Sequence, residues 1–309
     1  MIIDFEHHYL PEGFKKGPLP PGIGDIEEHL HNMDLAGIDV AVLSVHAPMY
    51  APSTAECRAL NDALSQLQLK HPKRLVGLVH TRPQDATEAV AELDRGVKAL
   101  GLKGVDMTAQ PGGRPVDDPA LWPFYQKVQE LGVPIYIHCS TGPLVGFSAL
   151  DAPYSIERGL GWELELMTCT TRLVMGAVLK DFPELKIVVS HFGGGISSIV
   201  ERLEGDTGAR QASPGPSSGK TDRPFRDGLS MLYFDMAGCR GGMGAVQAAL
   251  TALRPAQLVF ATDYPYNFYN KPDEIKKYVQ NIRNLSISKD SIAGMLGTNA
   301  ARILKILPA

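Results

Sequence analysis

Short apolar segments rich in β-branched residues alternate along the chain with longer amphipathic segments, a pattern typical of parallel α/β proteins. Strands are expected at Ile2–Glu6, Val40–Ser44, Leu75–Val79, Leu102–Met107, Val133–His138, Leu185–His191, Met231–Asp235 and Leu258–Asp263. Helices are expected at Gly24–Ala36, Ser53–Lys70, Asp85–Leu100, Asp118–Leu131, Leu164–Lys180, Pro272–Asn284 and Lys289–Leu304. Strands with helices between most of them predict a (β/α)8 barrel, whose functional residues lie at the C-terminal ends of the strands.

A doubly wound open sheet is the alternative fold. That fold often carries a Gly-x-Gly-x-x-Gly segment after its first strand, and no such segment follows Ile2–Glu6. No internal repeat or long linker divides the chain, so residues 1–309 are expected to form a single barrel domain. Two long connections are expected, Ser140–Trp162 over the barrel mouth and Gly205–Arg223 between the sixth and seventh strands.

The composition of the 309-residue chain, with 44% hydrophobic and 21% charged residues, is that of a globular protein with a substantial core. The net charge of -4 and the lack of a basic block argue against a nucleic-acid partner and favour a small-molecule ligand. The chain shows no signal-peptide pattern and no long apolar run, so we expect a cytoplasmic protein without a membrane partner. The four cysteines form no Cys-x-x-Cys pair, which favours reduced thiols.

Three side chains able to bind a metal, Glu6, His7 and His8, come at the end of the first expected strand. Because side chains alternate along a strand, Glu6 and His8 are expected on one face and His7 on the other. A carboxylate beside an imidazole can hold a divalent metal if other strand ends supply further donors. For this run alone, a solvated polar N-terminus is the alternative interpretation.

Further donors occupy the ends of three other expected strands. His138 ends the fifth strand, His191 the sixth and Asp263 the eighth. In a barrel these ends converge on one face, so the three residues would meet Glu6 and His8 there. Each residue alone has an ordinary structural explanation, because a single His is often hydrogen-bonded and an Asp after a strand often caps a helix. Their joint placement favours a metal centre.

Motifs along nearly the whole chain resemble the amidohydrolase superfamily. They are Ile3–Pro11, Met33–Asp39, Tyr136–His138, Asp181–Lys186, Ser190–Gly195, Thr262–Pro265 and Asn299–Arg302. The set resembles the branch that contains aminocarboxymuconate semialdehyde decarboxylase, gamma-resorcylate decarboxylase and 5-carboxyvanillate decarboxylase. Many relatives carry His-x-His on the first strand, whereas Glu6 takes the first of these positions here, as in the aromatic-acid decarboxylases of the branch.

The resemblance implies one divalent metal ion held by Glu6, His8, His138 and Asp263, with His191 beside it. A carboxylate in place of an imidazole adds negative charge and a hard oxygen donor, which favours Mn2+, with Zn2+ as the alternative. No organic cofactor is expected. Relatives are commonly dimers or tetramers, so the resemblance also implies a homodimer or homotetramer.

The implied reaction is the non-oxidative decarboxylation of an aromatic, ortho-hydroxybenzoate-like acid or of a muconate-like acid. Chelation through a carboxylate and an adjacent hydroxyl would orient such a substrate. Asp263 is the implied donor of a proton to the ring carbon that bears the carboxylate, and His191 assists it. The expected partner is therefore a small-molecule carboxylic acid.

The motif after the sixth strand departs from this pattern. In gamma-resorcylate decarboxylase and its closest relatives, a Glu in this segment pairs with the strand-six His, and Gly194 takes that position here. The run Gly193–Gly195 is more similar to aminocarboxymuconate semialdehyde decarboxylase, in which the His activates a water. A metal-dependent hydrolase or hydratase of an amide, lactone or ring-cleavage dicarboxylate, with His191 as base, is the alternative activity. A catalytically silent binding protein that keeps the barrel is a third.

Several residues near strand ends or in mouth loops are candidates for substrate contacts. Arg82, near the end of the third expected strand, is placed either to face a carboxylate or to lie on the surface. The aromatic candidates for a pocket wall are Tyr50, Phe147, Tyr154, Trp162 and Tyr266. Each of these aromatic residues alone is more often part of the core or of the rim than of a pocket.

Overall fold

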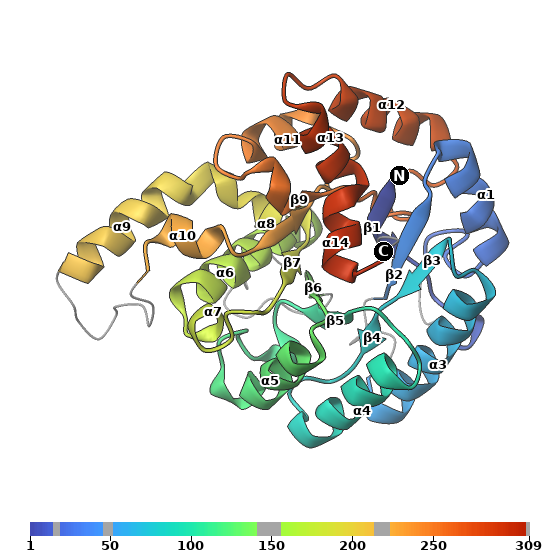
Figure 1. The fold of residues 1–309 in the computed structure, drawn as a ribbon, viewed down its shortest axis with the longest axis horizontal. Coiled ribbons are helices and arrows are strands. Elements are labelled where there is room, and N and C mark those ends of the chain that lie inside the picture. The colour runs from blue at the N-terminus through green and yellow to red at the C-terminus, as the bar shows by residue number, and fades with distance from the viewer. Residues whose placement is uncertain (15–18, 46–51, 141–155, 213–222, 307–309) are drawn as a thin grey trace.

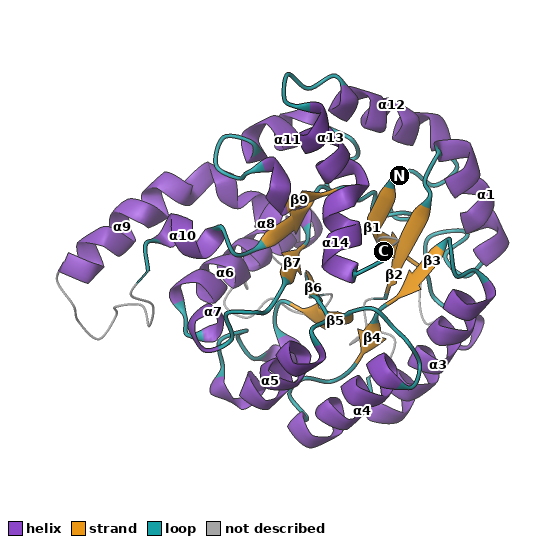
Figure 2. Ribbon diagram, viewed as in Figure 1, coloured by secondary structure: helices purple, strands orange, loops and turns teal. Residues whose placement is uncertain are grey.

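The computed structural model describes residues 1–14, 19–45, 52–140, 156–212 and 223–306, without the side chains of residues 207–212. The strands are β1 (Ile3–His8), β2 (Val40–Ser44), β3 (Leu75–Gly77), β4 (Val79–His80), β5 (Val105–Thr108), β6 (Ile135–His138), β7 (Ile187–Val189), β8 (Tyr233–Asp235) and β9 (Leu258–Val259). Neighbouring strands pair in parallel. They occupy the centre of the molecule, and helices surround them (Figure 2).

The strands form two sheets whose orders are β1-β2-β3 and β4-β5-β6-β7-β8-β9. Leu78 separates β3 from β4, but the hydrogen bonds continue across this break. The N–H of Lys103 donates to the carbonyl of Gly77 at 3.0 Å, and the N–H of Val79 donates to the carbonyl of Gly104 at 2.8 Å. Together β3 and β4 therefore form one strand of the barrel.

β1 closes the barrel against the segment around β9. The N–H of Phe5 donates to the carbonyl of Phe260 at 2.9 Å, and His7 pairs with Tyr264 in an isolated parallel bridge. With β3 and β4 counted as one strand, the barrel has the eight strands of the predicted (β/α)8 fold. The prediction of a barrel is confirmed, and the open sheet is excluded because a closed barrel has no edge strands.

Helices surround the strands, and α9 projects away from the ring (Figure 1). The helices are α1 (Ile26–Ala36), α3 (Thr54–Lys70), α4 (Ala86–Lys98), α5 (Trp122–Leu131), α6 (Trp162–Met175), α7 (Val178–Asp181), α8 (His191–Gly195), α9 (Val200–Ala212), α10 (Phe225–Leu229), α11 (Met243–Ala249), α12 (Pro272–Arg283), α13 (Lys289–Ala293) and α14 (Asn299–Leu304). Local signals set several ends. A capping box of Ser53 and Glu56 starts α3, and Gly37, with φ of 78°, ends α1.

The barrel interior is apolar near the end at which the strands begin. Side chains such as Ile3, Val42 and Leu78 pack together there, and α14 adds Ala300 and Leu304 to the same cluster. α14 therefore closes the end of the barrel at which the strands begin. The opposite end, where the strands finish, is called the mouth below.

Two expected elements differ in the structure. The helix expected at Leu164–Lys180 is divided into α6 and α7, because Gly176 takes an extended conformation with ψ of -168°. The first part of the expected loop Gly205–Arg223 is helical and belongs to α9, while residues 213–222 lie outside the described residues. In the loop expected at Ser140–Trp162, residues 157–161 form a π-helical turn before α6, and residues 141–155 are not described.

No disulfide joins any of the four cysteines Cys57, Cys139, Cys169 and Cys239, as expected from their spacing. Within the described residues, no helix has the length and apolar character needed to cross a membrane.

Candidate metal centre

β1 directs two candidate ligands into the barrel and one out of it. Its pairing with β2 shifts register between Asp4 and His7, which marks a β-bulge. Glu6 and His8 face the interior, whereas Nδ1 of His7 lies 2.8 Å from Oδ2 of Asp4 on the outer side. The predicted alternation thus holds from Glu6 to His8. It does not extend back to Asp4, because the bulge inserts an extra residue between them.

Five donors, defined here as the metal cluster, converge at the mouth. Glu6, His8 and His138 offer ligand atoms that all lie within 4.8 Å of one another. Oε1 of Glu6 lies 2.8 Å from Nε2 of His138 and 3.5 Å from Nε2 of His8. Oδ1 of Asp263 lies 3.2 Å from Nε2 of His8, and Nε2 of His191 lies 3.7 Å from Oε2 of Glu6. The structure thus brings together the five residues named from the strand ends.

Two imidazoles of the metal cluster are held on the side away from Glu6. Nδ1 of His8 lies 3.0 Å from Oγ of Ser44, and Nδ1 of His138 lies 2.9 Å from the carbonyl oxygen of Cys139. Because a carbonyl only accepts, Nδ1 of His138 carries a proton, and Nε2 is the nitrogen that faces Glu6. Outer hydrogen bonds of this kind orient the histidines of metal sites.

His191 receives its outer partner from a different element. Its Nδ1 lies 2.9 Å from Oε1 of Glu163, which is in the first turn of α6, 28 residues earlier in the chain. The carboxylate accepts from Nδ1–H and leaves Nε2 facing Glu6. The residue that pairs with this His is therefore not in the segment that follows it, where Gly194 stands, but on the neighbouring helix.

The backbone after β7 explains this arrangement. All five residues of α8 have positive φ, from 51° at His191 to 71° at Gly195, and so form a left-handed turn. Such a turn strains residues with a Cβ, which is why three of the five are glycines. A Cβ at Gly194 would collide with the carbonyl oxygen of Glu163. The glycine therefore allows α6 to approach closely enough for Glu163 to reach His191.

Asp235, the last residue of β8, holds the backbone of His191. Its Oδ1 accepts from the N–H of His191 at 2.9 Å and from the N–H of Ala237 at 3.0 Å, and its Oδ2 accepts from the hydroxyl of Tyr136 at 2.9 Å. Burial raises the pKa of Asp235 to about 7, and the negative charge of Glu6 acts in the same direction.

A second polar network lies outside the barrel, behind β1. Asp4 accepts from the N–H and the hydroxyl of Thr262, at 2.8 and 2.6 Å. Nε2 of His7 lies 2.9 Å from Nδ1 of His29, whose Nε2 lies 3.0 Å from the carbonyl oxygen of Gly22. The network ties β1 to α1 and to the segment after β9, and so supports the backbone of three members of the metal cluster. His7 thus lies on the opposite face of β1 from Glu6 and His8, as expected.

The charges in the metal cluster stabilise one another. Burial opposes ionisation of Glu6, but the charge of His191 and close contacts with His138 and His8 outweigh it and hold the pKa of Glu6 well below its usual range. Burial also opposes charge on His8, yet Asp263 and Glu6 raise its pKa to about 9. The pKa of Asp263 is raised, chiefly by burial. An ionised carboxylate thus faces protonated imidazoles, and a divalent cation would displace their protons.

Arg82 binds one neighbour on its own loop and one in the segment before α3. Its Nε donates to Oδ2 of Asp85 at 2.5 Å, and its Nη1 donates to the carbonyl of Pro52. Its side chain is 31% exposed. This placement supports the surface alternative for Arg82 over a contact with substrate.

Two aromatic candidates have defined surroundings. The ring of Tyr266 stands edge-on to that of His8, with centroids 5.2 Å apart. The ring of Trp162, at the start of α6, lies under the guanidinium of Arg158 at 5.7 Å. Tyr266 therefore borders the metal cluster. The remaining candidates lie outside the described residues: Tyr50, Phe147 and Tyr154.

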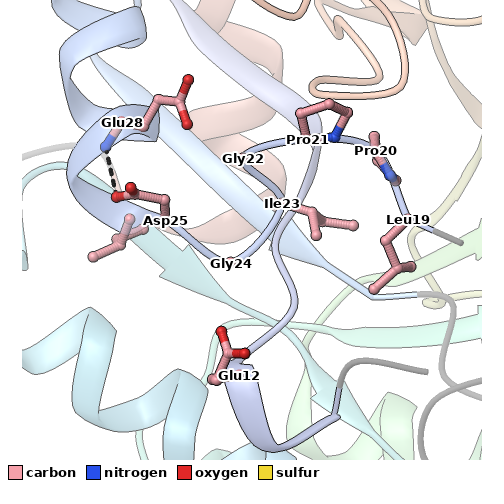
Figure 3. A pocket seen from close by; sticks show the side chains of 10 residues that line it. Glu12, Leu19, Pro20, Pro21, Gly22, Ile23, Gly24, Asp25 and Glu28 are labelled. Carbon is pink, nitrogen blue, oxygen red and sulfur yellow. Dashed lines mark hydrogen bonds between the residues drawn. The ribbon is translucent and has the colours of Figure 1, made fainter. Parts of the chain in front are cut away.

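A pocket of about 610 Å³ lies in the segment that joins β1 to α1 (Figure 3). It is lined by Glu12, by residues 19–26 and by Glu28. Asp25 on its wall caps α1 by accepting from the N–H of Glu28 at 3.1 Å. The lining includes no member of the metal cluster.

The pattern of the sequence had not pointed to four buried or half-buried residues at or near the metal cluster. Asp235 ends an expected strand, so the rule that selected Asp263 applies to it equally. His80 and Asp106 follow or lie within expected strands and carried the same signal. Glu163 carried none, because its partner is 28 residues away and only the packing of α6 brings the two together.

A closed (β/α)8 barrel with buried carboxylates and imidazoles at its strand ends defines a metal-dependent barrel enzyme. The chain belongs to the amidohydrolase family, whose model matches residues 3–306.

Several known proteins are similar to this chain. The gamma-resorcylate decarboxylase of Polaromonas sp. is 28% identical over 289 residues, which are 89% of this chain and 85% of that protein. The 2-keto-4-carboxy-3-hexenedioate hydratase of Sphingobium sp. is 29% identical over 243 residues, 66% of this chain and 69% of that protein.

Two solved structures share the fold over nearly the whole chain. The 5-carboxyvanillate decarboxylase from Sphingomonas paucimobilis gives a TM-score of 0.87 at 25% identity and covers 99% of each chain. A dihydroxybenzoic acid decarboxylase from Polaromonas sp., solved with manganese and the inhibitor 2-nitroresorcinol, gives a TM-score of 0.81 at 23% identity and covers 100% of this chain and 98% of that chain.

Proposed function

We propose that this protein is a mononuclear metal-dependent decarboxylase of an aromatic, ortho-hydroxybenzoate-like acid or of a muconate-like acid. The observation that carries the proposal is the buried grouping of Glu6, His8 and His138 at the mouth of the barrel. Similarity to gamma-resorcylate and 5-carboxyvanillate decarboxylases over most of the chain supports it. The partner would be a small carboxylic acid, with no role for nucleic acid or a membrane.

Glu6, His8, His138 and Asp263 would hold the ion, and their surroundings fit it. Glu6 is 0% exposed and faces imidazole nitrogens, yet within the described residues neither of its oxygens has a well-aligned hydrogen bond. A buried carboxylate in this state is stabilised by a cation. The outer hydrogen bonds of His8 and His138 direct Nε2 of each toward the same point. Two carboxylates and two imidazoles favour Mn2+, with Zn2+ as the alternative.

The bound ion would act as a Lewis acid that orients a substrate carboxylate and its adjacent hydroxyl and stabilises negative charge on oxygen. His191 would place a hydrogen-bonding group beside that substrate. Its Nδ1 is held by Glu163 at 2.9 Å and its backbone by Asp235 at 2.9 Å, so the ring has one fixed orientation. Nε2 of His191 would therefore bind a substrate oxygen without reorganisation.

Asp263 would deliver the proton. Its Oδ2 accepts from the amide of Asn267 at 2.6 Å, which fixes the carboxyl group. A carboxyl group held in one place beside the bound ring can pass a proton to it. The proton would move to the ring carbon that bears the carboxylate, the bond between that carbon and the carboxylate would break, and carbon dioxide would leave without any redox change. Asp263 would then regain a proton from solvent.

Metal content and carbon dioxide release, measured on one preparation, test the proposal. Protein expressed in manganese-supplemented medium should carry about one ion per chain. It should release carbon dioxide from at least one member of a panel of hydroxybenzoates, vanillate derivatives and ring-cleavage acids. Turnover of esters or lactones without carbon dioxide release would exclude a decarboxylase. Absence of stoichiometric metal would favour a silent binding protein.

Asp263→Asn tests the role of Asp263 as proton donor while it leaves the fold intact. The variant keeps the size of the side chain but removes its acidic proton, so turnover should be lost while the thermal transition stays close to that of the wild type. Asp273→Asn, at a residue whose side chain is 92% exposed, is the matched control and should be fully active. Near-normal activity of Asp263→Asn would contradict the assigned role.

A hydratase is the second candidate function. Similarity to the 2-keto-4-carboxy-3-hexenedioate hydratase and the run Gly193–Gly195 after His191 favour it. An unsaturated keto-dicarboxylate would then lose its ultraviolet absorbance on incubation with the protein, without release of carbon dioxide. Carbon dioxide release without loss of an alkene would decide for the decarboxylase.

The assembly and the location of the protein stay predictions. We expect a homodimer or homotetramer in the cytoplasm. Light scattering coupled to size-exclusion chromatography would give the first, and a monomeric mass would contradict it. Fractionation of source cells would give the second.

A further inference from the structure

One buried histidine inside the barrel has a ring that finds no hydrogen-bond partner among the described residues. His80, the last residue of β4, is 0% exposed, and in the described part of the chain neither ring nitrogen has a hydrogen bond. Val76 and Leu78 belong to the apolar interior of the barrel. Because side chains alternate along a strand, His80 points into the same interior, closer to the mouth.

The backbone of His80 is held firmly, in contrast to its ring. The side chain of Asn61 on α3 accepts from the N–H of His80 at 2.8 Å and donates to its carbonyl at 2.9 Å. Asn61 also donates to the buried Glu92 at 2.7 Å, and Glu92 accepts from Arg95 at 2.7 and 2.8 Å. A buried network thus sets the position of an imidazole that makes no hydrogen bond to any residue the structure describes.

Asp106 on β5 is the neighbour of His80. The two residues are opposite each other in the pairing of β4 with β5, and Oδ2 of Asp106 lies 3.9 Å from Nδ1 of His80, too far for a hydrogen bond. Asp106 is 2% exposed. Its Oδ2 accepts from the N–H of Val45 at 3.3 Å, whereas among the described residues its Oδ1 has no hydrogen-bond partner. The hydroxyl of Thr81 beside them is in the same state.

The pair lies beside the metal cluster. Burial raises the pKa of Asp106 to about 7, and the charges of His138 and His8 act against this rise, so these groups are electrostatic neighbours. Thr108, two residues further along β5, pairs in register with His138. A substrate bound at the metal cluster can therefore extend toward β4 and β5, where His80 and Asp106 offer polar atoms without a hydrogen-bond partner among the described residues.

A hydroxyl group suits these unused groups. Burial lowers the pKa of His80 to about 3, so the ring is neutral, with one N–H donor and one acceptor nitrogen. A hydroxyl oxygen can accept from that N–H while its own proton is donated to Oδ1 of Asp106. A second carboxylate would instead be repelled by Asp106.

A purely structural role does not account for His80 and Asp106. Buried polar groups without partners destabilise the folded state, and apolar side chains of similar size would suit the barrel interior better. Residues whose side chains destabilise the folded state are typical of functional sites.

We propose that His80 and Asp106 form a hydroxyl subsite, which binds a hydroxyl group of the substrate while the metal cluster binds its carboxylate. The inference rests on the proposed function and deepens it. It narrows the substrate to an acid that carries a second hydroxyl in addition to the one next to the carboxylate, as in a dihydroxybenzoate.

Isothermal titration calorimetry on the manganese-loaded protein tests the hydroxyl subsite. The probes are 2-hydroxybenzoate and its 2,3-, 2,4-, 2,5- and 2,6-dihydroxy relatives, which differ by one hydroxyl. At least one dihydroxybenzoate should bind the wild type about tenfold more tightly than 2-hydroxybenzoate. His80→Leu should reduce this ratio to about one and leave the affinity for 2-hydroxybenzoate within about twofold.

Asp106→Asn is a second variant, which keeps the shape of the side chain if His80→Leu does not fold. Its carbonyl oxygen must face the N–H of Val45, so its NH2 group faces the subsite and cannot accept the hydroxyl proton. The ratio should again fall toward one. Ser65→Ala removes a buried hydroxyl on α3, outside the barrel, and as a control should leave the ratio unchanged. The subsite is overturned if the wild type shows no dihydroxy preference, or if the preference survives both variants.

Resorcinol separates this inference from the decarboxylase proposal, because it carries two hydroxyls and no carboxylate. In crystals soaked with resorcinol, a ligand oxygen within about 3.2 Å of a ring nitrogen of His80 and of Oδ1 of Asp106 would support the subsite. A water that stays in that place, or no oxygen at all, would overturn it. If no hydroxybenzoate binds the metal-loaded wild type, the aromatic form of the proposed function fails and the resorcinol result alone decides the subsite.

Discussion

Two sets of strand ends at the barrel mouth hold their buried imidazoles in different ways. At the ends of β1, β6 and β7, His8, His138 and His191 each have Nδ1 held by an outer partner at 2.9 to 3.0 Å. At the ends of β4 and β5, the ring of His80 has no hydrogen bond to any described residue, although Asn61 binds both the N–H and the carbonyl of its backbone.

The difference indicates what kind of ligand each set of imidazoles suits. An outer hydrogen bond fixes the tautomer and the orientation of a ring, which a metal needs because its ligands must present lone pairs in a set geometry. A neutral ring whose position is set but whose nitrogens are unused can offer a donor or an acceptor to an arriving group. The imidazoles at the ends of β1, β6 and β7 therefore suit a metal ion, and the imidazole on β4 suits a neutral polar group.

Glu6→Gln should have the largest effect on metal binding and turnover, because Glu6 faces the three imidazoles whose Nδ1 is held by an outer partner. The substitution keeps the shape of the residue and removes a negative charge that three imidazoles share. The variant should no longer retain metal, which metal analysis by mass spectrometry measures. Its turnover should fall by about 10³-fold or more. Glu27→Gln, at a side chain that is 70% exposed, is the control. Full metal content in Glu6→Gln would refute the assignment of Glu6 as a metal ligand.

Glu163→Ala should lower kcat about 10- to 100-fold, because the outer partner of His191 is lost while the metal ligands remain. Glu163→Gln keeps an acceptor for Nδ1–H and should restore most of the activity, which a merely structural residue would not require. Separate kcat and KM values and unchanged metal content check the prediction. The exposed Glu201→Ala is the control. Wild-type kcat in Glu163→Ala would show that anchoring of His191 is unimportant.

Gly194→Ala should destabilise the protein by about 2 kcal/mol, a factor of about 30 in the folding equilibrium, since its φ is 70° and a Cβ would meet α6. Chemical denaturation measures the change. Gly244→Ala, in α11 with open space around the new methyl group, should instead leave stability unchanged or raise it slightly. Equal stabilities of the two variants would mean that α6 does not depend on the glycine.

The affinity for Mn2+ should rise with pH, by about tenfold per unit for each proton displaced. The pKa of His8 is raised to about 9, so at neutral pH the ion must remove a proton, and the rise should flatten above about pH 9. Titrations at several pH values measure the slope. His80 stays neutral throughout, since its pKa is lowered to about 3, so His80→Leu should leave the slope unchanged. An affinity independent of pH below 9 would contradict the prediction for His8.

The barrel could be predicted because the pattern of each strand lies in its own few residues. Element ends were harder. The sixth expected strand, Leu185–His191, shortens to Ile187–Val189 because a left-handed turn begins at His191. In β1 the alternation that correctly separates His7 from Glu6 and His8 fails one step earlier, where the bulge adds a residue.

The candidate ligands could also be found from the sequence, since parallel strands in a barrel must end on one face. Their contacts could not. Alternation says that Glu6 and His8 share a side, but the distance of 2.8 Å from Glu6 to His138 depends on how the barrel closes. Arg82 shows the same limit, because the sequence left two placements open and did not reveal its bond to Asp85.

The sequence by itself determined the order of strands and helices and the five donors of the metal cluster, because periodicity and strand ends are local properties. Only the tertiary structure decided which group orients His191 and which imidazole remains unused. Glu163 reaches His191 across 28 residues because Gly194 lets α6 approach, and His80 faces Asp106 because β4 and β5 pair in one register. Contacts of this kind depend on the close packing of distant segments, which no single stretch of the chain encodes.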